Sequence, residues 1–218
     1  MELDIKMCGL KTDEAVDAAL AGGARYIGFI FFPKSPRNVV AETAARLRRA
    51  AEGKAQAVAV TVDADDEALE HIVKSMQPDM LQLHGKESPQ RVRALKARYG
   101  LPVMKAIPVR EAADLTAIDA YRGIADRFLL DAKPPAGAEL PGGNGIPFDW
   151  SLLASLDGEV DYMLSGGLNA ANIGQALSAC QPRGIDVSSG VEGAPGEKDP
   201  ELIRAFFQAV HAARPERV

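Results

Sequence analysis

The stretch LDIKMCGLKTDEAVDAALAGGARYIGFIFF, residues 3–32, contains the pattern that decides the fold. Two short apolar runs, at 3–8 and 26–32, flank a segment that begins after Thr12 and ends at two glycines. Threonine is a favoured residue at the start of a helix, and glycine commonly follows its end. The stretch therefore predicts a strand, a helix and a second strand.

The same alternation continues along the chain. Helices are expected to begin after Ser88, at Asn169 and at Asp199, which precedes a proline at the first helical position. Strands alternating with helices indicate a parallel sheet with the helices outside it. The further expected strands are 56–62, 80–84, 102–107, 127–132, 161–165 and 184–189.

The number of strand–helix units distinguishes two parallel folds. Each unit takes roughly 25–30 residues, close to the minimum for a βαβ repeat. Eight units in a chain of 218 residues favour a closed barrel over an open doubly wound sheet. The expected fold class is α/β, a single-domain (β/α)8 TIM barrel over residues 1–218, with its active site at the carboxyl ends of the strands.

Composition excludes several classes of protein. The chain is 47% hydrophobic with a net charge of −5, which argues against a nucleic-acid-binding surface. No apolar run approaches the roughly 18 residues needed to span a bilayer, so no membrane contact is expected. Glu2 and Asp4 stand where a signal peptide would need a basic and then an apolar segment. Cytoplasmic residence is the expectation.

Cysteine and histidine usage argues against structural cross-links. The chain has only Cys8 and Cys180, too few for a disulfide framework in a chain of this length. Its three histidines, His71, His84 and His211, are widely separated, and no metal-ligand spacing appears. No metal site is expected.

The spacing around Cys8 and Asp131 predicts that both side chains face the barrel mouth. Side chains alternate along a strand, so Lys6 and Cys8 share one face, as do Leu129 and Asp131. A thiol and a carboxyl group facing one cavity make a candidate base and acid. The alternatives are a small core thiol and a helix-capping aspartate.

Two glycine-bearing stretches follow the last two strands. LSGGL (164–168) and DVSSGVE (186–192) occupy the loops that commonly bind phosphate in a (β/α)8 enzyme. Glycine lets backbone N–H groups approach phosphate oxygens closely. Two ordinary tight turns are the alternative.

Two further polar residues end strands. Arg37 lies in FFPKSPRN (31–38), where its guanidinium could bind a carboxylate through two hydrogen bonds. His84 ends the fourth strand and could contact a ligand. A solvated loop arginine and a structural histidine remain open as alternatives.

Taken in order, seven motifs resemble those of the phosphoribosylanthranilate isomerases, (β/α)8 enzymes of tryptophan biosynthesis. The resemblance runs from residue 6 to residue 199 and covers nearly the whole chain. Two departures are Asn144, where threonine is expected, and Met7, where isoleucine is common. The motifs are KMCG, FIFFPKSPR, LQLHG, LLDA, GGNGIPFDW, LSGGL and GIDVSSGVEGAPGEKD.

The resemblance implies an Amadori rearrangement of a phosphosugar, with no metal or organic cofactor. Asp131 then resembles the general acid that opens the furanose, and Cys8 the general base that takes the C2′ proton. Arg37 resembles the residue that faces the anthranilate carboxylate, and the resemblance implies that Asp186 reaches a sugar hydroxyl. The residues that resemble the phosphate site are Gly166, Gly167, Ser188, Ser189 and Gly190.

A cysteine base needs help from its surroundings. An unperturbed thiol with a pKa of about 8.5 is only a few per cent thiolate at pH 7, so the site is expected to lower the pKa of Cys8. Two strand residues span about 6.6 Å, which brings the charge of Lys6 to the same face as the thiol. Alternatively, Lys6 pairs only with a carboxylate below the cavity.

Two other functions remain as alternatives. One is the related aldose–ketose isomerase of histidine biosynthesis, which typically has an aspartate in place of Cys8. The other is a non-catalytic module that binds phosphate or flavin. The sequence leaves a monomer and a homodimer both open.

Overall fold

The computed structural model describes residues 3–135, 137, 140–143, 145, 147–156 and 158–214. Asn144, which stands where the family resemblance leads us to expect threonine, lies outside these residues. Strands β1 to β8 pair in parallel, and β8 pairs with β1 to close the barrel, so the expected fold is confirmed. The strands are β1 (Asp4–Cys8), β2 (Tyr26–Phe31), β3 (Gln56–Thr61), β4 (Met80–Leu83), β5 (Val103–Val109), β6 (Arg127–Ala132), β7 (Tyr162–Leu164) and β8 (Gly184–Val187).

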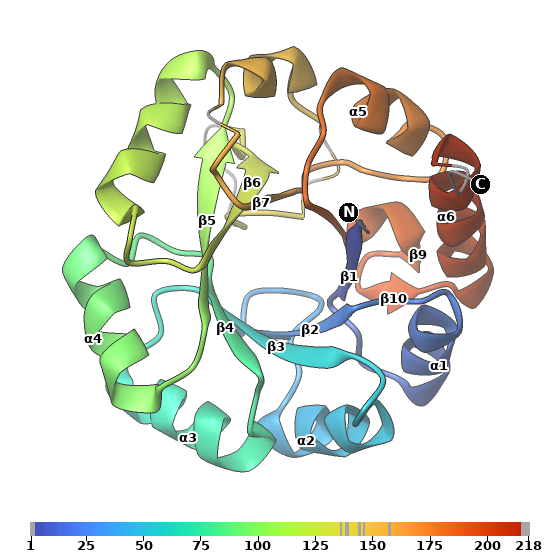
Figure 1. The fold of residues 1–218 in the computed structure, drawn as a ribbon. Coiled ribbons are helices and arrows are strands. Elements are labelled where there is room, and N and C mark those ends of the chain that lie inside the picture. Colours follow the sequence, from blue (N-terminus) through green and yellow to red (C-terminus); the bar gives the residue numbers. More distant parts are fainter. Residues whose placement is uncertain are drawn as a thin grey trace.

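The helices form a ring outside the strands (Figure 1). Those connecting or following the barrel strands are α1 (Asp13–Ala21), α2 (Ala41–Ala50), α3 (Asp66–Met76), α4 (Pro89–Tyr99), η1 (Ala112–Tyr121), η2 (Trp150–Ser155), α5 (Ile173–Ala179) and α6 (Pro200–Ala213). After β5 and β6 the connections are the 3₁₀ helices η1 and η2 rather than α-helices. A further short 3₁₀ helix, η3 (Ser189–Val191), follows β8.

The predicted helix starts agree with the structure at three positions and differ at one. Thr12 and Ser88 accept hydrogen bonds from the backbone three residues on, and Asp199 accepts one from the N–H of Glu201. Such caps stabilise a helix by about 1 kcal/mol each. The helix expected at Asn169 begins instead at Ile173.

A local turn delays the start of α5. The side-chain oxygen of Asn169 accepts hydrogen bonds from the N–H groups of Ala171 (2.9 Å) and Asn172 (3.2 Å). Asparagine often bonds to backbone nearby in this way, and the bonds compete with helix formation. The prediction that Asn169 opens the helix was therefore wrong.

The strands have two buried faces, as expected for a barrel. The outer-face residues Ile5 and Met7 belong to a large hydrophobic cluster that also contains buried residues of the helices. The inner face forms a separate cluster that includes Cys8 and Leu129. Alternation thus directs Lys6, Cys8 and the end of β6 to the inside of the barrel.

A small hairpin follows β8 that was not expected from the sequence. It consists of β9 (Glu192–Ala194) and β10 (Glu197–Lys198), which pair antiparallel. Gly196 at its turn has a φ of +83°, and a Cβ there would collide with the carbonyl oxygen of Pro36. The hairpin therefore packs closely against the loop after β2.

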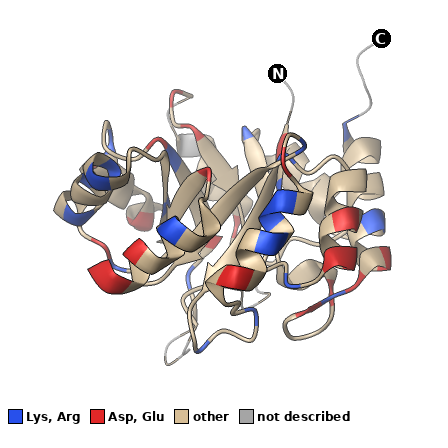
Figure 2. Ribbon diagram, turned by 90° about the horizontal axis from the view of Figure 1, so that it is seen from below, with Lys and Arg blue, Asp and Glu red and all other residues tan. Residues whose placement is uncertain are grey.

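Figure 2 shows acidic and basic residues interspersed along the outer helices. Arg98 on α4, for example, pairs with Asp66 and Glu70 on α3. These pairs are exposed to solvent, which screens the attraction between the charges, so they add little to stability. Across the described ranges, helices that could cross a membrane are not found.

Candidate active site

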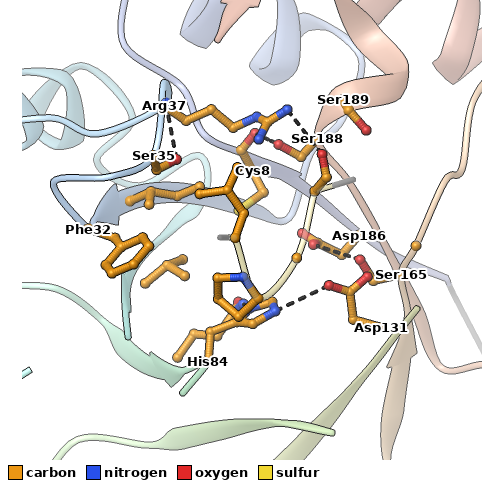
Figure 3. Close-up of a pocket in the computed structure, with 18 of the residues that line it drawn as sticks. Cys8, Phe32, Ser35, Arg37, His84, Asp131, Ser165, Asp186, Ser188 and Ser189 are labelled. Carbon is orange, nitrogen blue, oxygen red and sulfur yellow. Dashed lines mark hydrogen bonds and ion pairs between the residues drawn. The ribbon is translucent and has the colours of Figure 1, made fainter. Parts of the chain in front are cut away.

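A pocket opens at the carboxyl ends of the barrel strands, with about 660 Å³ of empty space including its open mouth. Figure 3 shows Arg37 and Ser188 toward one end, and His84 and Asp131 toward the other. The expected site residues in its wall are Cys8, Arg37, His84, Asp131, Gly166, Gly167, Asp186, Ser188 and Ser189.

Cys8 and Lys6 flank a glycine on the neighbouring strand. Gly28 on β2 is the register partner of Cys8. A Cβ on Gly28 would lie 3.0 Å from Cys8 Sγ and 3.1 Å from Lys6 Nζ. The glycine therefore leaves room for the thiol and the ammonium group to approach the same point.

Lys6 is fully buried below the pocket and forms an ion pair there. Its Nζ donates to Asp186 Oδ1 at 2.7 Å, and Asp186 Oδ2 accepts from Ser165 Oγ at 3.3 Å. Asp186 is therefore a carboxylate partner of the kind considered as the alternative role of Lys6. Asp186, expected to reach a sugar hydroxyl, lines the pocket with both carboxylate oxygens already bonded.

The pKa of Cys8 is raised above its ordinary value. Burial is the largest cause, and the Asp186 charge adds to it, while the Lys6 charge lowers the pKa. Burial also opposes the charge on Lys6, but Asp186 and Cys8 outweigh it and raise the pKa of Lys6. The expected lowering of the pKa of Cys8 is therefore not found, because burial outweighs the effect of Lys6.

A chain of three polar side chains leads to Asp131. Gln82 Nε2 lies 2.9 Å from His84 Nδ1, and His84 Nε2 lies 3.2 Å from Asp131 Oδ2. Because an amide nitrogen only donates, His84 Nδ1 accepts and its Nε2 carries the proton donated to Asp131. The other Asp131 oxygen accepts the N–H of Ala132 at 3.0 Å.

Gln82 was not singled out from the sequence. It is fully buried on the inner face of β4 and lines the pocket. A polar residue between Leu81 and Leu83 in an apolar strand was the available signal, since buried polar groups need partners.

The loop after β6 covers the pair formed by His84 and Asp131. A Cβ on Gly142 would collide with Asp131 Oδ2 and lie 2.7 Å from His84 Nε2. Only a residue without a side chain can bring the backbone this close. The next residue, Gly143, accepts a hydrogen bond from Arg37 Nη2 at 3.4 Å.

Arg37 is buried, not solvated. Its Nε donates to Glu192 Oε1 at 2.7 Å, and its Nη2 donates to Glu192 Oε2 at 2.8 Å. Burial disfavours the Glu192 carboxylate, but Arg37 and Lys198 outweigh burial and lower its pKa to about 2. Glu192 is therefore a carboxylate in the folded protein at neutral pH.

Lys198 connects this cluster to the strand ends. Its Nζ donates to Glu192 Oε1 (2.6 Å), to the Ser188 carbonyl oxygen (3.0 Å) and to Ser188 Oγ (3.2 Å). Ser188 Oγ in turn donates to the Cys8 carbonyl oxygen at 3.1 Å. The Ser188 hydroxyl proton is thus engaged within the protein. Glu192 and Lys198 lay in a quoted motif but were not identified as site residues.

The loops after β7 and β8 interlock beside the pocket. Gly166 and Gly167 have φ values of +90° and +65°, which favour glycine. A Cβ on Gly190 would collide with the carbonyl oxygen of Leu168. The glycines allow the two loops to pack with their backbones in contact.

The family model for N-(5'phosphoribosyl)anthranilate (PRA) isomerase matches residues 5–209 of this chain. This chain belongs to that family. A relative from Chelativorans sp., named N-(5'-phosphoribosyl)anthranilate isomerase, is 76% identical over 217 residues, covering 100% of both chains. One of the same name from Brucella canis is 72% identical over 210 residues, covering 96% of this chain and 95% of its own.

Solved structures of PRA isomerases share the barrel. The Thermotoga maritima enzyme is 32% identical with a TM-score of 0.86, covering 97% of this chain and 100% of its own. Another, in complex with reduced 1-(o-carboxyphenylamino)-1-deoxyribulose 5-phosphate, is 31% identical with a TM-score of 0.84 and the same coverage.

Proposed function

We propose that this chain converts N-(5′-phosphoribosyl)anthranilate into 1-(2-carboxyphenylamino)-1-deoxyribulose 5-phosphate, an aldose–ketose isomerisation in tryptophan biosynthesis. The observation that carries the proposal is that Cys8 and Asp131 line one pocket from the ends of β1 and β6. Full-length identity of 76% to a relative of that name supports the same substrate. The product analogue bound by a solved relative supports the same pocket chemistry.

Asp131 is the proposed general acid. It gives its proton to the furanose ring oxygen, the C1′–O bond breaks, and the nitrogen lone pair forms a protonated Schiff base. The carboxylate left behind accepts hydrogen bonds from His84 Nε2 and from the Ala132 N–H. Donors already in place stabilise the charge without reorganisation.

Cys8 is the proposed general base. Its thiolate takes the proton from C2′, the C–H electron pair forms the C1′–C2′ double bond, and the C1′–N π pair returns to the nitrogen. The resulting enolamine then gains a proton at C1′ and loses the 2′-hydroxyl proton, which gives the ketone. The positive Schiff base beside the thiolate favours its charged form, as Lys6 does, and offsets the effect of burial. The substrate is therefore part of what activates the thiol.

The remaining side chains are proposed to bind the substrate. Arg37 binds the anthranilate carboxylate. Ser189 and the backbone N–H groups of the loops at 166–167 and 188–190 bind the phosphate. Asp186 reaches a sugar hydroxyl. Gln82 Oε1, buried and without a partner in the described part of the chain, accepts from a sugar hydroxyl.

A direct assay tests the function. The purified protein is incubated with N-(5′-phosphoribosyl)anthranilate, and its fluorescence is expected to decay many times faster than spontaneously. The matched control is the phosphoribosyl aminoaldose of histidine biosynthesis, for which much slower turnover is expected. Fluorescence that decays at the spontaneous rate, or faster turnover of the control, contradicts the proposal.

The protein is proposed to be a monomer or a homodimer. A Thermotoga maritima structure is described as that of monomers generated from a dimeric isomerase. Light scattering of the purified protein distinguishes the two forms, and a larger assembly contradicts both.

A further inference from the structure

Two charged residues of the β9–β10 hairpin, Glu192 and Lys198, have no role in the chemistry proposed above. Both are buried, with side chains 4% and 2% exposed. Burying charges is costly unless they are paired and hydrogen-bonded. Their position beside Arg37 shows what they contribute.

Glu192 occupies one edge of the Arg37 guanidinium. It accepts from Nε and Nη2 with two bonds of 2.7 and 2.8 Å, the geometry of a bidentate pair. Arg37 also lines the pocket, and in the described ranges no protein group accepts from its Nη1. Nη2 already donates to Glu192 and to the Gly143 carbonyl oxygen, so Nη1 is the nitrogen left for a ligand.

The Glu192 carboxylate is itself held in place. Oε1 also accepts from Lys198 at 2.6 Å, and Oε2 also accepts the N–H of Gly196 at 3.1 Å. With four donors on two oxygens, the carboxylate has little freedom to turn. The hairpin therefore fixes Glu192, and Glu192 fixes Arg37.

The three charges sum to a single positive charge. Arg37 and Lys198 contribute two cations and Glu192 one anion, while the nearby Lys6 and Asp186 cancel. One excess positive charge at this end of the pocket complements one carboxylate. A ligand group without charge would leave it uncompensated in a partly dry site.

We infer that Glu192 is a positioning residue that sets substrate specificity: it orients Arg37 toward the pocket, so that a ring carboxylate is selected over an uncharged ring. Lys198 supports it by holding the Glu192 carboxylate. This inference rests on the proposed function and names the residue behind its preference for the aryl carboxylate.

The test compares two substrates that differ by that carboxylate. They are N-(5′-phosphoribosyl)anthranilate and N-(5′-phosphoribosyl)aniline, each formed from ribose 5-phosphate and the free amine. The readout is the ratio of their kcat/KM values. A structural defect lowers both values together, whereas loss of Arg37 orientation lowers only the first.

Glu192→Gln is expected to lower the ratio by about tenfold or more, mainly through KM for the anthranilate substrate, because the buried charged bond is lost. Glu192→Gln/Lys198→Met is expected to do the same. The double variant removes a cation with the anion, so it remains informative if the single variant does not fold. Glu201→Gln, an exposed residue of α6, is the matched control and keeps the wild-type ratio.

A wild-type ratio in a folded Glu192→Gln or double variant overturns the inference, because specificity then does not depend on Glu192. Equal loss for both substrates also overturns it and makes Glu192 merely structural. Failure of the wild-type protein to convert either substrate overturns the proposed function instead. The two failures are therefore distinguishable.

Discussion

Two opposing effects act on the thiol of Cys8. Burial raises its pKa because the thiolate loses hydration, and the negative charge of Asp186 acts in the same direction. The positive charge of Lys6 lowers it. A buried cation and anion paired below one thiol thus pull its pKa in opposite directions.

Substitution of either member of the pair is expected to move the pKa of Cys8 with opposite sign. Lys6→Met removes a cation near the thiolate and raises the pKa further, whereas Asp186→Asn removes an anion and lowers it. The measurement is the rate of alkylation by iodoacetamide against pH. A Cys180→Ala background removes the only other thiol.

The sign of each shift fixes the result. In Lys6→Met the rate curve moves to higher pH, and in Asp186→Asn it moves to lower pH. Cys180→Ala alone serves as the reference curve. An unmoved curve in Lys6→Met removes Lys6 from the activation of the thiol.

Strand periodicity was sufficient to predict which way Cys8 and Asp131 face, because a closed barrel buries alternate residues on its inside. It could not predict the partner of Arg37. Arg37 and Glu192 lie 155 residues apart, and their contact depends on how the hairpin after β8 packs. The only hint was that Glu192 lay within a recognised motif.

At the scale of elements, the proposed phosphate site requires the loops after β7 and β8 to pack with their backbones in contact. Gly190 in η3, which follows β8, packs against the backbone of Leu168 after β7. Gly166 packs against β6, where a Cβ would lie 2.7 Å from the Ala132 nitrogen. Three consecutive strands thus contribute backbone to one corner of the pocket.

Gly190→Ala is expected to disturb this corner. The new methyl group collides with the Leu168 carbonyl and forces the loops apart, at a cost of about 1–3 kcal/mol. KM for the phosphorylated substrate rises accordingly, while kcat changes less. Steady-state kinetics and urea unfolding together measure both effects.

Gly174→Ala is the matched control. Gly174 lies within α5, and outside that helix the nearest atom to a Cβ there, among the described residues, is Ala213 Cβ at 3.8 Å. Alanine favours a helix over glycine by up to about 1 kcal/mol, so stability is kept or increased and KM is unchanged. An unchanged KM in Gly190→Ala argues against the phosphate role of this loop.

The elements themselves were largely predictable. Apolar runs bounded by caps and glycines marked all eight strands, because each strand must bury both faces. The 3₁₀ form of η1 and η2 was not predictable, since 3₁₀ runs as long as the ten residues of η1 are uncommon. The β9–β10 hairpin has too few residues to show a strand period.

At the scale of the whole molecule, the two ends of the barrel have different roles. At the amino ends of the strands, Arg127 pairs with Asp4 and Asp161 and lies over the Tyr26 ring. Arg25 also pairs with Asp4, so two cations balance two anions at this end. At the carboxyl ends, a thiol, a carboxyl group and a guanidinium group line the pocket.

Barrel closure brings the two proposed catalytic groups together. Cys8 ends the first strand and Asp131 the sixth, and pairing of β1 with β8 places both at one mouth. An open sheet of the same strands would leave β1 and β6 at separate positions along it. The proposed roles of Cys8 as base and Asp131 as acid therefore depend on closure of the barrel.

The most direct test of these two roles is the turnover of Cys8→Ala and Asp131→Asn, measured together with binding of the reduced product analogue. Each variant is expected to lose about 10²–10⁴-fold in kcat, the usual contribution of a general acid or base, while the analogue still binds within a few-fold of wild type. Cys180→Ala, which changes a buried thiol outside the pocket, keeps wild-type kcat. Near-normal kcat in either Cys8→Ala or Asp131→Asn contradicts the assignment of that residue.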